Sequence, residues 1–254
     1  MQQSRRVHYY VAFVCILGGV SLGYWLAKLN LVRMDRGAII ASLFFFVSVV
    51  GADLFATLIP AFRKDISASV ALWIAAVVSL GPPLGILVVV LATFTSELYL
   101  RVIHPGRRNN FKIVIEVMSF NILQVALTIC LTSGYFVLVR APTGHLSVWI
   151  DFLKVTSGFF IAVLINSSLV SGVVSLSTNQ SLRYLTSEWF RDFTFQYLIL
   201  CISALLLVVL YSLSPWHMLL GLTPLVLVHL SFRSYLRIRE EAQKTFEKVV
   251  ELLE

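Results

Sequence analysis

The chain is a succession of long apolar stretches separated by short segments that carry most of the charge. Several stretches reach about 18 or more predominantly apolar residues, the length that an α-helix needs to cross a bilayer. The pattern predicts eight membrane-spanning helices, at about residues 8–27, 38–60, 66–80, 84–103, 111–139, 149–175, 192–213 and 216–235. The expected fold class is therefore an all-α polytopic membrane protein.

The third expected span is the shortest, and Gly81-Pro82-Pro83 separates it from the fourth. Short or proline-broken apolar segments often mark binding sites in transporters, because freed backbone groups line a cavity. If residues 66–103 instead form a re-entrant hairpin, six spans remain. Either count places both termini on one side of the membrane.

The distribution of basic residues orients the spans. If both termini are cytoplasmic, the outer segments hold five of the twenty Lys and Arg residues, namely Lys28, Arg33, Arg36, Arg140 and Lys154. An excess of basic residues on the inner segments is the bias of the positive-inside rule. We therefore expect both termini on the cytoplasmic side, and we attribute the net charge of +7 to topology rather than to nucleic-acid binding.

Composition agrees with a membrane protein and excludes several classes of function. Charged residues make up 13% of the chain, against about 25% in soluble domains. Cys15, Cys130 and Cys201 lie inside apolar runs, which favours buried thiols over metal ligands. No nucleotide-binding loop, metal motif or nucleophile-and-base arrangement is present. We expect no catalytic residue, no metal and no cofactor.

One polar segment, residues 177–193, does not fit a span. Leu182, Leu185 and Trp189 recur at helical spacing, which favours a short helix at 177–191 lying in the cytoplasmic interface of the membrane. A plain connecting loop is the alternative interpretation.

A polar stripe follows the fifth expected span. Asn121, Gln124, Thr128, Thr132 and Tyr135 are spaced by three or four residues and so share one helix face. Asn166 in the sixth span, His229 in the eighth and Gly81, Pro82 and Pro83 at the break complete the candidates for a ligand pocket. Interhelical hydrogen bonding, at about 0.6–2 kcal/mol per contact, is the alternative role of such residues.

Acidic residues near the expected cytoplasmic ends have basic neighbours one helical turn away. Glu97 precedes Arg101 by four residues, and Glu116 follows Lys112 by four. We interpret both as ion pairs rather than as catalytic carboxylates. Small residues also recur at helix-contact spacing, at Gly19 and Gly23 in the first span, without indicating which helix they contact.

The last span continues without Gly or Pro after Pro224 into a charged helix with an apolar stripe. The residues expected to transmit a signal are Tyr235, Ile238, Ala242, Phe246, Val249 and Leu253. We divide the chain into a transmembrane bundle, 1–235, and a cytoplasmic connector or coiled-coil helix, 236–254. A parallel homodimer would bury the stripe; a membrane surface or a following domain would do so as well.

The connector resembles a known family. EEAQKTFEKVVELLE, residues 240–254, looks like the helix that precedes the HD-GYP phosphohydrolase domain of bacterial cyclic-di-GMP signalling proteins, and similar helices precede GGDEF cyclase and histidine-kinase domains. The rest resembles the multi-span sensor modules of those proteins, through the Gly81-Pro82 break and Phe120-Asn121-x-x-Gln124. The catalytic motifs of the HD-GYP and GGDEF domains are absent from the chain.

The resemblance implies a non-catalytic sensor that relays a ligand or membrane signal to an output domain, in cis or in trans, such as a cyclic-di-GMP phosphodiesterase. The chain would then be either the membrane fragment of a longer protein or the partner of a separate one. The polar stripe and the broken third span fit a small-molecule transporter or substrate-capture subunit equally well, and that is the alternative function.

Overall fold

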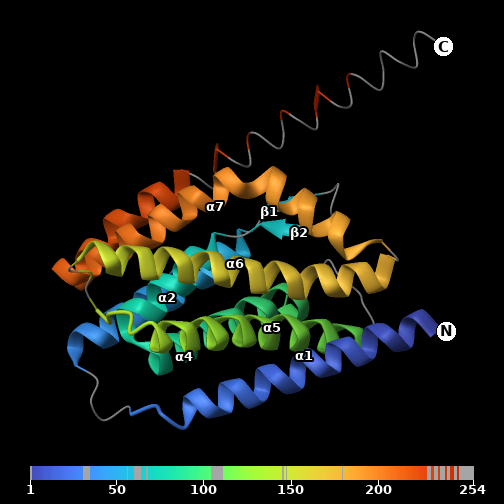
Figure 1. The fold of residues 1–254 in the computed structure, drawn as a ribbon, viewed down its shortest axis with the longest axis horizontal. Coiled ribbons are helices and arrows are strands. Elements are labelled where there is room, and N and C mark those ends of the chain that lie inside the picture. The colour runs from blue at the N-terminus through green and yellow to red at the C-terminus, as the bar shows by residue number, and fades with distance from the viewer. Residues whose placement is uncertain are drawn as a thin grey trace.

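The computed structural model describes residues 2–30, 35–55, 57–59, 64–66, 68–103, 111–144, 146, 148–178 and 180–227, and beyond them 230, 231, 234, 238, 241, 242 and 245. The described part is a bundle of helices lying side by side, with α1 (Gln2–Leu26) along one edge (Figure 1). The other helices are α2 (Arg36–Leu54), α3 (Ser69–Leu80), α4 (Pro82–Leu98), α5 (Phe111–Leu138), α6 (Trp149–Thr178) and α7 (Leu182–Leu213).

Two helical turns and one further helix complete the helical elements of the described chain. A π-helical turn, η2 (Tyr99–Ile103), continues α4, and a 3-10 turn, η3 (Pro215–His217), follows α7. The turn η3 opens an apolar helix, Pro215–Leu227. We call this helix, together with the described helical residues that follow it as far as Thr245, the terminal helix.

Six helices in the described residues are long and apolar enough to cross a membrane. They are Arg5–Leu26, Arg36–Leu54, Pro82–Arg101, Val114–Leu138, Trp149–Thr178 and Phe195–Leu213. The expected number of eight is not confirmed. With 12 residues, α3 is about 18 Å long, whereas the apolar core of a bilayer is about 30 Å thick. A re-entrant hairpin at 66–103 would also leave six spans, but it would remove α4 from the count. Because α4 is among the six helices found here, the two sets of six differ.

Short as it is, α3 lies at the centre of the bundle. Every residue from Ser69 to Ser79 is buried, and the helix contacts α2, α4, α5, α6 and α7. A helix that is apolar all round has no solvent-facing side and is stable only when it is enclosed. The neighbouring helices provide that enclosure, so α3 is the core around which the longer helices pack.

The turn after α3 is built by its sequence. Gly81 has φ +82°, a conformation that glycine adopts without a steric penalty, and Pro82 occupies the first position of α4, where its fixed φ suits a helix. In α4, a β-carbon on Gly85 would lie 2.6 Å from the Cα atom of Val77. The glycines therefore allow α3 and α4 to form a tight antiparallel pair.

The predicted carboxyl end of the second span, residue 60, is wrong. The helix α2 ends at Leu54, and Thr57–Ile59 (β1) pairs antiparallel with Lys64–Ile66 (β2), Thr57 lying opposite Ile66. Pro60 follows Ile59 in the sequence, and a residue before proline is biased towards extended backbone. β-Branched Thr57 and Ile59 also favour a strand over a helix.

The predicted interfacial segment, 177–191, is helical from Leu182 onward, but this helix is not separate from the seventh span. Residues Leu182–Leu213 form one continuous helix, α7, so the expected break between 177–191 and the seventh span does not exist. The physical reason lies in the sequence, which contains neither Gly nor Pro between Leu182 and Leu213 to interrupt the helix.

The connections that were expected outside the cytoplasm gather at one end of the bundle, which we call the Gly81 end. The amide of Gly144, after α5, donates to Val78 O at 2.9 Å, and a β-carbon on Gly37, in the first turn of α2, would lie 3.7 Å from Pro215. The opposite end is the Gln2 end, at the right of Figure 1. The membrane topology, and the side that faces the cytoplasm, stay predictions.

Candidate functional site

The polar residues near the Gln2 end form an ion-pair cluster between α4 and α5. Arg101 Nε, in the π-helical turn, donates to Glu97 Oε2, and Asn121 Nδ2 donates to Glu97 Oε1 at 2.8 Å. The side chains of Arg101 and Glu97 are only 18% and 13% exposed. The expected pair of Glu97 with Arg101 is present. Because both carboxylate oxygens accept hydrogen bonds, the cluster joins two helices and leaves no free acid.

Glu116, the acid of the second expected ion pair, has a neighbour that the sequence did not indicate. Glu116 Oε1 lies 3.5 Å from Nδ1 of His8, at the start of α1. The side chain of Lys112 lies outside the described residues, so the predicted pairing with Glu116 is untested. His229 also lies outside them.

The polar stripe of α5 bonds to a neighbouring helix and to its own backbone. Gln124 Nε2 donates to Asn166 Oδ1 of α6. Thr128 Oγ1 donates to Gln124 O at 2.9 Å, and Tyr135 shares a 2.6 Å hydrogen bond with Ser157 Oγ of α6. Gln124 and Thr128 are buried. The bonds of Gln124 and Tyr135 to α6 fit the interhelical packing interpretation of the stripe.

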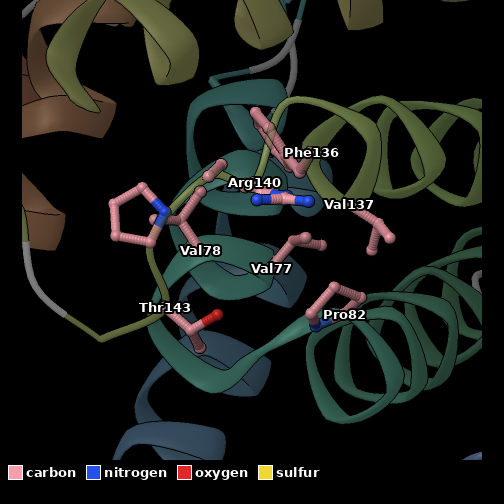
Figure 2. A pocket seen from close by; sticks show the side chains of 9 residues that line it. Val77, Val78, Pro82, Phe136, Val137, Arg140 and Thr143 are labelled. Carbon is pink, nitrogen blue, oxygen red and sulfur yellow. The ribbon is translucent and has the colours of Figure 1, made fainter. Parts of the chain in front are cut away.

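A cavity lies elsewhere, at the Gly81 end. Its volume is about 250 Å³, and it is lined by Val77, Val78, Pro82, Phe136, Val137, Arg140, Ala141, Pro142 and Thr143. These residues come from the end of α3, the start of α4, the last turn of α5 and the loop after it (Figure 2). We call this cavity the Gly81-end pocket. Of the predicted ligand-pocket residues that the structure describes, Pro82 alone lines it.

The floor and the rim of the pocket differ in chemistry. Val77, Val78 and Phe136 are buried, with 2–4% of their surface exposed. Arg140 and Thr143 are exposed at the rim, and in Figure 2 the guanidinium of Arg140 lies between Phe136 and Val77. The pocket therefore has apolar walls and one cationic group.

The sequence offered a weak signal for Arg140. It is one of only five basic residues on the expected outer segments, whereas most Lys and Arg residues lie on the expected inner segments. What could not be foreseen is that the loop after α5 folds back onto α3, through the hydrogen bond of Gly144 N to Val78 O.

Comparisons with known protein families, with curated proteins and with solved structures find no match to this chain. Its function therefore has to be argued from its own geometry. No cluster of three or more His, Cys, Asp or Glu side chains in the described part of the chain could hold a metal ion. The Gly81-end pocket is accordingly the candidate binding site.

The residues expected to transmit a signal are only partly described. Ile238 and Ala242 are helical and exposed. Tyr235, Phe246, Val249 and Leu253 lie outside the described residues. Ile238, Ala242 and Thr245 are spaced by four and three residues, so they share one helix face, and that face is uncovered in the single chain.

Proposed function

We propose that the chain is a non-catalytic sensory module of the bacterial inner membrane with both termini in the cytoplasm. It relays an event at the Gly81 end through the terminal helix to a cytoplasmic output domain. The observation that carries this proposal is the terminal helix itself. Each described residue from Leu230 to Thr245 is helical and exposed, so these residues lie outside the part that the bundle covers.

A chain of contacts connects the pocket with that helix. Val77 and Val78 belong both to the floor of the pocket and to the central helix α3, which packs against α7. The terminal helix in turn contacts α7 closely, since a β-carbon on Gly221 would lie 2.6 Å from Leu207 Cδ2. Helices that shift or rotate against one another are a common form of allosteric transition.

The exposed face at Ile238, Ala242 and Thr245 needs a partner. A helix of this length is marginally stable alone in water, and 66% of the surface of Ile238 is exposed. A second copy of the chain, in parallel, would bury this face in a coiled-coil seam. The resemblance of residues 240–254 to the connectors of signalling proteins favours an HD-GYP phosphodiesterase as the output domain.

The relay is tested by changing the phase of the connector in a fusion to an HD-GYP phosphodiesterase domain. Two residues inserted after Arg239 rotate everything beyond them by about 200°, whereas seven inserted residues nearly restore the phase. We expect the two-residue insertion to change cyclic-di-GMP hydrolysis severalfold and the seven-residue insertion to leave it near that of the parent fusion. Equal hydrolysis by all three proteins would contradict the relay.

The transporter alternative is supported by the same pocket, because it is open at one end of a membrane bundle. It predicts uptake of a solute into proteoliposomes that contain the chain alone, and uptake that survives deletion of residues 236–254. The sensory proposal predicts no uptake above that of empty liposomes.

A further inference from the structure

The Gly81-end pocket combines a single cation with apolar walls. We propose that it is a binding site for a small free carboxylate with an apolar body, whose carboxylate pairs with Arg140 and whose body lies against Val77, Val78 and Phe136. The role of this ligand as the signal of a sensor rests on the proposed function. Its binding to the pocket does not depend on that function.

The guanidinium of Arg140 is available to an anion. Among the described residues it has no hydrogen-bond or carboxylate partner, and the hydrogen bonds of Arg140 are made by its backbone. Guanidinium presents paired N–H groups that fit the two oxygens of a carboxylate. The hydroxyl of Thr143 turns towards the same space in Figure 2. A cation at the rim beside apolar walls favours an anionic ligand with an apolar body, because the charge can pair with the guanidinium at the rim while the body is buried on the floor.

The backbone holds Arg140 in place before any ligand binds. Its φ of 50° is the one positive value among the described non-glycine residues. Lys154 Nζ donates to Arg140 O at 3.1 Å, and Ala141 N donates to Phe136 O at 2.8 Å. Non-glycine residues in this conformation persist only where the surroundings fix them, and they are frequent at binding sites.

The size of the pocket limits the ligand. An apolar cavity of about 150 Å³ accommodates benzene, with six heavy atoms. By that proportion, the volume of about 250 Å³ corresponds to about ten heavy atoms. Phenylacetate has this size, one carboxylate and an apolar ring, and it is the probe that we choose. The ring would lie on the buried floor while the carboxylate reaches the rim.

Binding is measured by isothermal titration of phenylacetate into the full chain in phosphatidylcholine nanodiscs. We expect saturable binding that weakens about two- to fivefold in Arg140→Asn, since asparagine keeps the left-handed backbone but removes the charge, and a pair at the exposed rim is partly screened by solvent. Arg140→Lys retains part of the affinity. The matched control is Lys28→Gln, which removes one charge after α1 at a side chain that lies against Tyr24 rather than in the pocket.

A second pair of variants tests the apolar part without touching the charge. Val137 lines the pocket and is 59% exposed, whereas its neighbour Leu138 is 81% exposed and does not line it. Val137→Trp blocks the mouth and weakens binding at least tenfold, while Leu138→Trp leaves it unchanged. Because both side chains are exposed, neither change disturbs the core.

Three results would overturn the site. They are wild-type affinity in both Arg140→Asn and Val137→Trp, equal binding of the neutral phenylacetamide, and loss of phenylacetate binding when phosphatidylglycerol replaces a third of the lipid. The last result would assign the site to a lipid headgroup instead of a free acid. A failure of any kind here leaves the connector insertions to test the relay separately.

Discussion

Gly85 of α4 and Val77 of α3 meet at backbone contact: a β-carbon on Gly85 would lie 2.6 Å from the Cα atom of Val77 and 2.8 Å from its nitrogen. Val77 is at the same time part of the floor of the Gly81-end pocket. The close approach of two helices at a glycine thus sets the position of one wall of the candidate binding site.

The first prediction concerns this contact. Gly85→Ala forces α3 and α4 apart and destabilises the fold by about 1–3 kcal/mol, the usual cost of overpacking. Thermal unfolding in detergent, followed by tryptophan fluorescence, measures the loss. The matched control is Gly134→Ala in α5, where no atom lies within 4 Å of the added carbon. Equal stability of the two variants would contradict the tight crossing.

The second prediction separates the polar stripe from the pocket. Gln124 and Asn166 bond to each other, so the double variant Gln124→Leu with Asn166→Leu costs less than the sum of the two single variants. We expect a coupling of about 0.6 kcal/mol, and at most about 1.7 kcal/mol, from unfolding of all four proteins. Gln124→Leu should leave phenylacetate binding unchanged. Loss of binding in that variant would place the ligand among the stripe residues instead.

The third prediction concerns the cluster at Glu97. The guanidinium of Arg101 is largely buried, and Glu97→Gln removes its carboxylate partner. We therefore expect a loss of about 1–3 kcal/mol in unfolding free energy. Adding Arg101→Gln recovers part of that loss, because no unpaired charge remains. Glu116→Gln serves as the control, since its partner His8 is 58% exposed and an exposed pair contributes about 0–1 kcal/mol. A Glu116→Gln loss as large as that of Glu97→Gln would contradict the assignment.

The positions of most helices follow from the sequence, because long apolar runs leave few alternatives. The run expected at 149–175 is the helix Trp149–Thr178, and the one expected at 111–139 is Phe111–Leu138. The errors occur where apolar character does not decide between helix and strand, as at Thr57–Ile59. For Ser69–Leu80, composition predicted burial in lipid, whereas the helix is buried in protein.

The site was harder to predict, because it depends on which segments become neighbours. Helical spacing placed Asn121, Gln124 and Thr128 on one face, but it does not name Glu97 or Asn166 as their partners. The pocket forms where the Gly81 turn meets the distant loop that carries Arg140. The sequence marked the turn by its Gly-Pro-Pro run and gave only a weak signal, an outer basic residue, for the loop.

The most direct test of the sensory account is the distance between two copies of Ala242. The native thiols Cys15, Cys130 and Cys201 are replaced by alanine, and a spin label at position 242 is measured by pulsed electron resonance in nanodiscs. The account predicts one short distance between copies, which shifts when phenylacetate is added and needs a higher concentration of the acid to shift in Arg140→Asn. The absence of a distance between copies, or an unchanged distance in a chain that binds the acid, would contradict it.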